Sequence, residues 1–138
     1  MMTDPIVLRL LVLGALLFAA GGAGVTLRRY FRNAQLPRNF DRRDVALSHP
    51  GPILVEFTSP FCHECQVALP VLEAVSASDG APLAVVDAKY RPDLATKYAI
   101  RTTPTILVVN AQGRVTHGWL DSAPTAQDVT EALALAYG

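Results

Sequence analysis

The stretch ILVEFTSPFCHECQVALP, residues 53–70, decides the fold. Its first part, Ile53–Thr58, is a continuous apolar run with β-branched and aromatic members, which is typical of a strand buried on both faces. The part that follows has a helical pattern and opens on the motif CHEC at residues 62–65. Two thiols placed in this way on the first turn of a helix can close into a disulfide and reopen.

The start of this helix favours a reactive thiol at Cys62. Unsatisfied backbone N–H groups and the positive end of the helix dipole stabilise a thiolate there. Cys62 and Cys65 are the only cysteines in 138 residues, so no structural disulfide framework accounts for them. A Cys-x-x-Cys between a strand and a helix therefore predicts thiol–disulfide chemistry, which uses the protein's own redox-active disulfide and no cofactor.

A metal site is the competing interpretation of the two cysteines. A structural zinc site needs four ligands, and the chain offers only the cysteine pair with His49, His63 and His117. The sequence holds no second Cys-x-x-Cys motif and no closely spaced histidine pair, and His63 lies inside the loop between the two sulfurs. We therefore predict no metal.

An apolar segment near the N-terminus predicts a transmembrane helix. Leu10–Leu27 is a run of eighteen residues without a charge. Extended back to Ile6, it is long enough for a hydrocarbon core of about 30 Å, and Arg9 can snorkel to the interface. We expect residues 1–30 to anchor the chain in a cell membrane, with residues 6–27 in contact with lipid.

The distribution of charge around this segment predicts its orientation. A cleaved signal peptide is the alternative, because the small residues Ala19–Gly24 could supply a cleavage site. The leading segment, however, carries only Asp4 and Arg9, whereas six arginines lie between residues 28 and 43. Because positive charge beside a span stays cytoplasmic, we expect a single-pass protein with a cytoplasmic domain. An extracytoplasmic domain remains the alternative.

Charge also separates the chain into two parts. Residues 1–43 hold seven basic and two acidic residues, whereas residues 44–138 hold five basic and ten acidic residues. A basic linker at residues 31–43 suits anionic lipid headgroups. Nucleic acid is excluded as a partner, because no base-stacking pattern accompanies the basic arm and the acidic domain would repel phosphate.

Residues 44–138 are expected to form one α/β domain. The expected helices cover Asp41–Ser48, Cys62–Ser78, Pro92–Tyr98 and Thr125–Tyr137, and the expected strands cover Ile53–Thr58, Ala81–Ala88, Thr105–Asn110 and Arg114–Leu120. This order predicts a central mixed sheet flanked by helices. Turn residues at 111–113 predict a hairpin between the last two strands.

Finer features of these elements follow from their patterns. We expect Ala81–Ala88 to be a second central strand. In the helix after the cysteines, Val67, Val71 and Val75 are expected to stack on one face. Thr125, with an aspartate three residues later, resembles a capping box at the start of the last helix.

Residues 40–138 resemble a thioredoxin-fold domain. The matching segments are ILVEFTS, PFCHECQVALP, the strand that ends at Asp87, and KYAIRTTPT, followed by a hairpin and a final helix. The most specific pieces are the two cysteines, Pro70 five residues after Cys65, and Ile100–Thr105. The resemblance implies a thioredoxin fold and a protein thiol–disulfide oxidoreductase.

The resemblance also implies roles for three residues. Cys62 is implied as the nucleophile that attacks a substrate disulfide, and Cys65 as the thiol that resolves the mixed disulfide. Glu56 falls six residues before Cys62, where thioredoxins hold a buried acid, and would deprotonate Cys65. A carboxylate in an apolar strand is costly, so the pKa of Glu56 should be raised. The alternative is an exposed glutamate without a role.

A substrate-binding surface is implied beside the cysteines. Pro104 matches the family's cis-proline, and a cis Thr103–Pro104 bond would expose the Thr103 backbone for pairing with an extended substrate. An ordinary trans proline is the alternative. Phe61 stands before the first cysteine, where thioredoxin has tryptophan, and is expected to contact substrate as well.

The chain departs from the family pattern at other positions as well. Thioredoxin has Gly-Pro between its cysteines, whereas this chain has His63 and Glu64. His63 should stabilise the Cys62 thiolate and Glu64 should act oppositely, so both are expected to tune the redox behaviour. Asp121 stands where a glycine is expected after the last strand.

We therefore predict a membrane-anchored thiol–disulfide oxidoreductase that acts as a reductase on protein substrates. Its expected partners are protein thiols and disulfides and an electron-donor reductase. One alternative places the same chemistry outside the cytoplasm, in cytochrome maturation or disulfide formation. The other is a redox-inactive binding module, which the presence of both cysteines, the acid and the proline disfavours.

Overall fold

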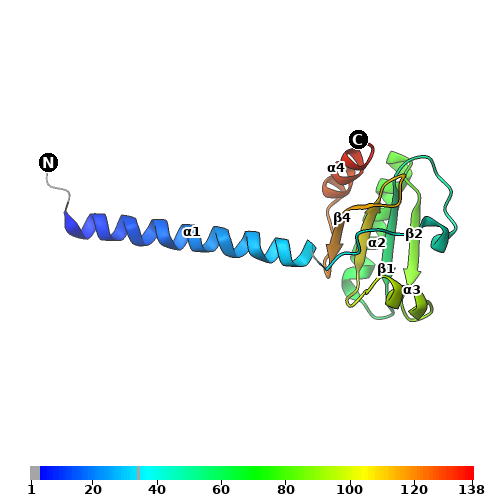
Figure 1. The fold of residues 1–138 in the computed structure, drawn as a ribbon, viewed down its shortest axis with the longest axis horizontal. Coiled ribbons are helices and arrows are strands. Elements are labelled where there is room, and N and C mark those ends of the chain that lie inside the picture. The colour runs from blue at the N-terminus through cyan, green and yellow to red at the C-terminus, as the bar shows by residue number, and fades with distance from the viewer. Residues whose placement is uncertain (1–3, 34) are drawn as a thin grey trace. The chain divides into compact units, whose positions relative to one another are not determined.

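The structure is a computed structural model that describes residues 4–33 and 35–138. The chain divides between Gln35 and Leu36 into two compact units. The first is a long helix and the second is an α/β domain (Figure 1).

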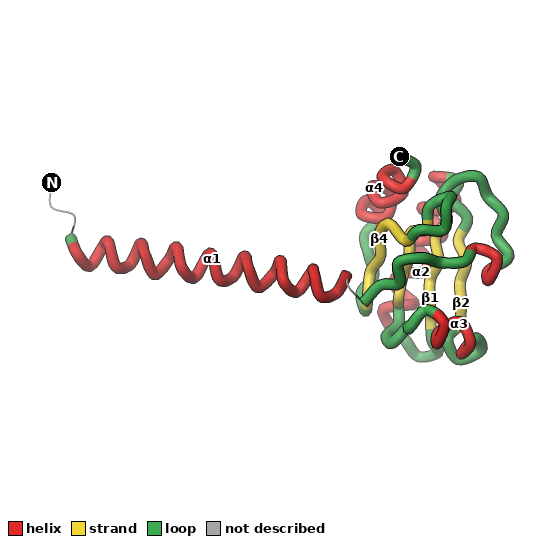
Figure 2. The backbone as a smooth tube through the Cα atoms, viewed as in Figure 1, coloured by secondary structure: helices red, strands yellow, loops and turns green. Residues whose placement is uncertain are grey.

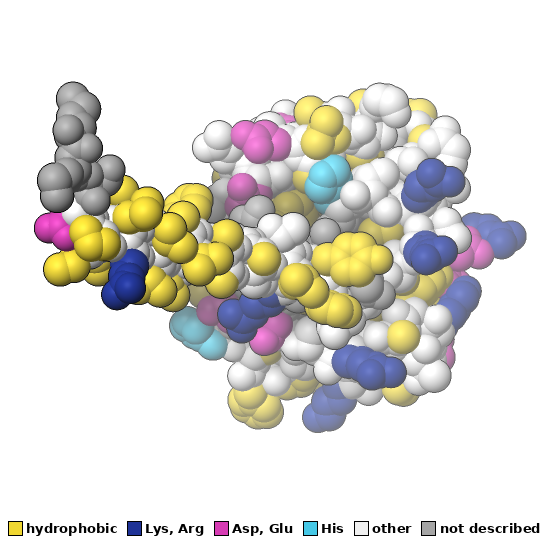
Figure 3. Space-filling model, turned by 60° about the vertical axis from the view of Figure 1, so that its left-hand side comes forward, with side chains coloured by type: hydrophobic (Ala, Val, Ile, Leu, Met, Phe, Trp, Pro, Cys, Tyr) yellow, Lys and Arg dark blue, Asp and Glu magenta, His cyan; other side chains and the backbone are white. Residues whose placement is uncertain are grey.

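The helix of the first unit, α1, spans Pro5–Asn33. Its segment Pro5–Arg28 has a mean hydropathy of 2.2, and none of it is buried within the chain. Figure 3 shows hydrophobic side chains all along the visible side of this helix. By length and composition such a helix can cross a membrane, and a signal sequence near an N-terminus has the same properties.

Residues 36–138, all of which the structure describes, form a four-stranded sheet with helices on both faces (Figure 2). The strands are β1 (Ile53–Thr58), β2 (Leu83–Asp87), β3 (Thr105–Val109) and β4 (Val115–Leu120). Their order is β2-β1-β3-β4; β1 runs parallel to β2, and the β1–β3 and β3–β4 pairs are antiparallel. The predicted mixed sheet is confirmed.

The helices separate into two layers. They are the 3-10 helix η1 (Arg42–Val45), α2 (His63–Asp79), α3 (Pro92–Lys97) and α4 (Ala126–Ala136). Side chains of α2 and α4 share one hydrophobic cluster with one face of the sheet, and residues of η1 and α3 pack against the other face. The predicted capping box is confirmed, because Thr125 and Asp128 exchange hydrogen bonds at the start of α4.

Strand β1 lies at the centre of the domain and leads directly to the cysteines. All its residues except Thr58 are buried. Because side chains alternate along a strand, Val55 and Phe57 pack on the α3 side, and Leu54 and Glu56 face α2. Each fully buried apolar side chain here contributes about 1.5–3 kcal/mol.

Strand β2 is not the central strand that its apolar sequence predicted. It pairs only with β1 and lies at the edge of the sheet, where Val85 is 48% exposed. Val86, on the opposite face, is buried against the α3 side. An apolar run indicates that a strand is buried against other elements, but it does not show whether the strand lies at the centre or at the edge of the sheet.

The buried face of α2 also differs from the prediction. Val67 is 45% exposed, and the buried residues are Cys65, Ala68, Leu72 and Val75. These four follow the helical spacing of three or four residues. Val67 lies five residues before Leu72, or about 140° around the helix, which turns it towards solvent.

The α/β domain begins at Leu36, within the segment 31–43 that was expected to be a linker. Phe40 is 2% exposed, and its ring stacks on that of Tyr98 with 4.5 Å between the centroids. The backbone carbonyl of Phe40 also lies where a side chain at Gly113 would meet it, and Gly113 has a φ of 81°, so this hairpin turn requires glycine. Residues from Leu36 onward therefore belong to the domain.

The helix expected over Asp41–Ser48 is only the short η1. Asp41 caps it by accepting a hydrogen bond from the Arg43 N–H, and Ala46 ends it with a left-handed φ of 53°. The Arg42 guanidinium then holds the following loop through the carbonyl oxygens of His49 and Gly51.

Candidate active site

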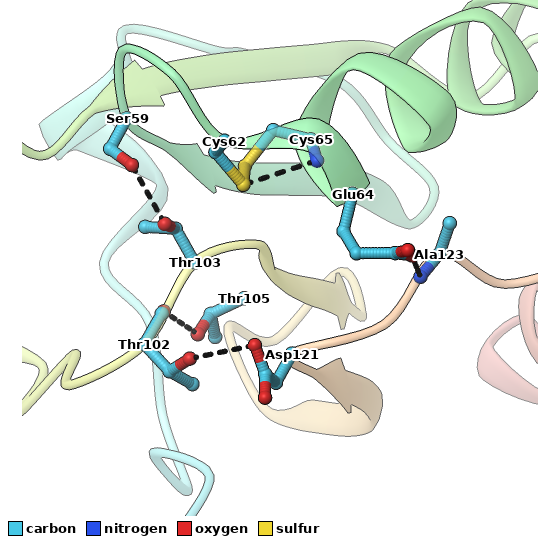
Figure 4. The surroundings of a disulfide bond; sticks show 9 residues. All are labelled: Ser59, Cys62, Glu64, Cys65, Thr102, Thr103, Thr105, Asp121 and Ala123. Carbon is cyan, nitrogen blue, oxygen red and sulfur yellow. Dashed lines mark hydrogen bonds between the residues drawn. A yellow bond between two sulfur atoms is a disulfide. The ribbon is translucent and has the colours of Figure 1, made fainter.

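The two cysteines form a disulfide at the N-terminus of α2 (Figure 4). Their Cα atoms lie 5.3 Å apart. Cys62 is the residue that caps the helix, and its Sγ accepts a hydrogen bond from the Cys65 N–H at 3.2 Å. Cys62 is partly exposed, whereas Cys65 is only 4% exposed. An incoming sulfur can therefore reach Cys62 more readily than Cys65.

The helix terminus provides the electrostatic environment of Cys62. The free N–H groups of the first turn and the hydrogen bond from Cys65 favour a negative charge on its sulfur. His63 and Glu64, the two residues between the cysteines, are both exposed. Glu64 is the acidic residue of the first turn, and its carboxylate is turned towards Ala123.

Glu56 is a fully buried acid on the face of the sheet that α2 covers. Its exposed fraction is 0%, and neither carboxylate oxygen has a hydrogen-bond partner among the described residues. Burial, and secondarily the negative charge of Glu73, raise the pKa of Glu56 to about 7. The expected buried acid with a raised pKa is therefore found, and an exposed strand end is excluded. Such a group can exchange a proton near neutral pH.

The loop before β3, which contains Thr102 and Thr103, lies beside the disulfide (Figure 4). The Thr103–Pro104 peptide bond is cis, as the resemblance implied, and Pro104 is buried. The hydroxyl of Thr103 lies 2.8 Å from that of Ser59, which belongs to the loop between β1 and α2. Sequence reasoning missed Ser59, because 44 residues separate it from its partner.

A third loop, residues 121–124 between β4 and α4, completes the surroundings of the disulfide. Asp121 has a left-handed φ of 59°, which explains why a glycine was expected there, and aspartate tolerates this conformation better than most residues. Its Oδ1 accepts a hydrogen bond from the Thr102 hydroxyl at 3.2 Å. The Ala123 N–H donates to Glu64 Oε2, also at 3.2 Å. Thr102 lies in the segment Ile100–Thr105 that carried the resemblance, but nothing in the sequence indicated its contact with Asp121, and Ala123 had no signal in the sequence.

Phe61 is the exposed aromatic residue beside the disulfide. Its side chain is 100% exposed, and its φ of 63° is left-handed, which is uncommon for a bulky residue. The ring therefore contributes nothing to the core of the domain. An apolar side chain held in solvent next to Cys62 is available for contact with a substrate.

His63 lies between the cysteines, whereas the other two histidines belong to other parts of the domain. His49 lies before β1, at the opposite end of that strand from the disulfide, and its Nδ1 accepts a hydrogen bond from the Gly51 N–H. His117 lies within β4. Over residues 4–33 and 35–138, no group of three or more His, Cys, Asp or Glu side chains is arranged to hold a metal ion.

Comparison with known sequences identifies relatives over the α/β domain. The sequence model of the thioredoxin family matches residues 35–133. Protein disulfide-isomerase tigA of Aspergillus niger is 38% identical over 76 residues, which cover 51% of this chain and 21% of that protein. Thioredoxin-like protein slr0233 of Synechocystis is 39% identical over 70 residues, which cover 49% of this chain and 66% of that protein.

Solved structures show the same fold. Thioredoxin NaTrxh of Nicotiana alata has a TM-score of 0.56 at 20% sequence identity and covers 66% of this chain and 77% of its own. Thioredoxin-2, a component of the malaria parasite protein secretion machinery, has a TM-score of 0.59 at 17% sequence identity. The match covers 71% of this chain and 93% of that chain. Thioredoxin family proteins act through their own redox-active disulfide without a separate cofactor. The family model matches most of this chain, the fold is the same, and a Cys62–Cys65 disulfide lies at the start of α2. The chain therefore belongs to the thioredoxin family.

Proposed function

We propose that this protein is a thiol–disulfide oxidoreductase that exchanges the Cys62–Cys65 pair with cysteines of protein substrates. The observation that carries the proposal is the accessible Cys62 sulfur, bonded to a buried Cys65 at a helix N-terminus. The match to part of a disulfide isomerase and to thioredoxins supports the same reaction class.

The reaction begins with both cysteines reduced. The Cys62 thiolate attacks one sulfur of a substrate disulfide, so that a bond forms between the two sulfurs while the substrate's own S–S bond breaks. The second substrate sulfur leaves as a thiolate and takes a proton from water. Free N–H groups at the start of α2 stabilise the attacking thiolate.

Cys65 then resolves the mixed disulfide. We infer that the Glu56 carboxylate accepts the Cys65 proton. Glu56 lies on the same face of β1 as Leu54, which packs against α2, and its pKa is about 7. The Cys65 thiolate attacks Cys62, the intramolecular disulfide forms, and the bound substrate sulfur leaves and is protonated. Two electrons have then passed from the protein to the substrate. The two substrate sulfurs take their protons from water, and Glu56 releases the proton of Cys65 to solvent.

The substrate is proposed to bind as an extended segment along Thr103. Neither backbone group of Thr103 has a hydrogen-bond partner among the described residues, so both are available to pair with a peptide. Phe61, the residue directly before Cys62, is fully exposed and adds an apolar contact.

Two further proposals concern the direction of electron transfer and the side of the membrane on which the domain lies. We propose a reductase whose disulfide is reduced again by a dithiol electron donor, and whose domain is tethered to a membrane by α1. The hydropathy of Pro5–Arg28 supports the anchor, and the arginines that follow it support a cytoplasmic domain. The opposite orientation, with the same chemistry outside the cytoplasm, is the second candidate, because a signal sequence has the same hydropathy.

Single cysteine variants of the full chain in detergent test the mechanism. With dithiothreitol as electron donor, Cys62→Ser should abolish the reduction of insulin disulfides. Cys65→Ser should retain the attack by Cys62 and accumulate a mixed disulfide, seen as a mass increase that excess dithiothreitol reverses. Wild-type turnover by both single variants would show that the pair does not act as a dithiol.

A further inference from the structure

The geometry points to Glu64 and Thr102 as positioning residues that hold the β4–α4 loop beside the disulfide and so shape the surface on which a substrate chain would bind. This inference rests on the proposed thiol–disulfide activity and extends it to these two residues, the clamp, which hold that surface. Figure 4 shows both contacts on the same side of the disulfide, one from α2 and one from the loop before β3.

Glu64 fastens one end of the β4–α4 loop. Its carboxylate reaches from the first turn of α2 to the Ala123 N–H, 59 residues away in the sequence. A hydrogen bond to an ionised acceptor is among the stronger ones. The Ala123 side chain packs against the cluster between α2 and α4, and the next residue, Pro124, is buried. This end of the loop therefore contacts both the hydrophobic core and α2.

Thr102 fastens the other end of the same loop. Its hydroxyl donates to Asp121 Oδ1, and the Asp121 N–H donates to the Pro104 carbonyl oxygen at 2.9 Å. The Ser59–Thr103 contact ties the same proline loop to the loop between β1 and α2. The three segments around the disulfide are thus joined in a ring.

The ring has a consequence for substrate binding. A loop that is ordered before binding does not have to be ordered by the substrate, so more of the contact energy appears as affinity. A small disulfide that touches only Cys62 does not use the surface that the loop shapes. The clamp should therefore affect the KM for a protein disulfide and leave the reaction of a small disulfide untouched. One net hydrogen bond corresponds to about a fivefold change in an equilibrium constant.

Two substitutions at Glu64 separate its charge from its hydrogen bond. Glu64→Gln removes the charge and keeps an oxygen that can accept from the Ala123 N–H, whereas Glu64→Ala removes both. The two variants should react alike with hydroxyethyl disulfide, because both lack the charge near Cys62. We expect the KM for insulin to be about fivefold higher in Glu64→Ala than in Glu64→Gln, with a similar kcat.

Thr102 offers an independent pair of variants. Thr102→Val has the same shape without the hydroxyl, and Thr102→Ser keeps the hydroxyl. The KM for insulin should rise several-fold in Thr102→Val relative to Thr102→Ser, again without a difference for hydroxyethyl disulfide.

The full chain in detergent, assayed with both disulfides, distinguishes the outcomes. Equal insulin KM values within each pair of variants would overturn the clamp and leave the proposed activity intact. A difference that extends equally to hydroxyethyl disulfide would also overturn it, because it would mark a general effect on the cysteines. A wild-type chain that reduces neither disulfide would overturn the proposed function and the clamp with it.

Discussion

The hydroxyl groups of Ser59 and Thr103 lie 2.8 Å apart and join the loop that carries the disulfide to the loop that carries the cis proline. Either hydroxyl can be the donor. The contact keeps the Thr103 backbone beside Cys62, where an extended substrate would pair. It depends on two small polar side chains whose identity alone gives no indication of a partner.

We expect the Ser59–Thr103 contact to contribute to stability as a coupled pair. Ser59→Ala and the shape-matched Thr103→Val should each destabilise the oxidised protein by about 1 kcal/mol, and the double variant should cost less than the sum. Urea unfolding followed by the fluorescence of Trp119, the single tryptophan, measures these effects. Strictly additive effects would show that the two hydroxyls do not interact.

Glu56 should give the stability of the domain a distinctive pH dependence. Its folded pKa of about 7 lies above the unfolded value of about 4.3, so the folded state holds the proton more tightly. Its stabilising contribution is complete below the unfolded pKa and is lost as pH rises towards the folded one. Across this window the free energy of unfolding should fall by roughly 4 kcal/mol and then level off.

Substitution of Glu56 tests this origin of the pH dependence. Glu56→Gln cannot titrate and should flatten the curve between about pH 4.3 and 7. Glu73→Gln removes the negative charge that helps to raise the pKa of Glu56, so it should shift the end of the fall to lower pH. The pKa values of Asp41 and Asp44 are lowered by their hydrogen-bonded partners, so these groups titrate below the window. An unchanged slope in Glu56→Gln would assign the pH dependence elsewhere.

Phe61 should matter for substrates and not for folding. Because its φ is positive and its ring is exposed, Phe61→Gly relieves an unfavourable backbone conformation without a loss of packing. We expect unfolding stability within about 1 kcal/mol of the wild type and a clearly higher KM for insulin. Leu135→Ala, at a residue 66% exposed on α4, is the control and should leave the KM unchanged. A strongly destabilised Phe61→Gly would instead mark Phe61 as a packing residue.

The orientation of the domain can be read from one reporter thiol. In a Cys62→Ser, Cys65→Ser background, Glu131→Cys places a thiol on the exposed side of α4. A cytoplasmic domain predicts that a membrane-impermeant maleimide labels this thiol only after the cells are permeabilised. Labelling in intact cells would favour the extracytoplasmic candidate.

The local chemistry of the site could be predicted from the sequence because it is set by neighbours along the chain. The spacing of Cys62 and Cys65 brings the two sulfurs together wherever a helix begins at that point. Glu56 is embedded in an apolar strand, so its burial follows from its neighbours. The hairpin at Gly113 and the capping box at Thr125 also involve residues within a few positions of each other.

The tertiary structure decided what depends on residues far apart in the sequence. Hydrophobic periodicity shows that β2 packs on a partner, but strand order decides that it lies at the edge with Val85 exposed. The inclusion of Phe40 in the core depends on its contact with Tyr98. The bond from Ala123 to Glu64 crosses 59 residues, and a short polar side chain in a loop carries no periodic signal that identifies so distant a partner. Only the packing of α2 and α4 on one face of the sheet brings these loops together around the disulfide.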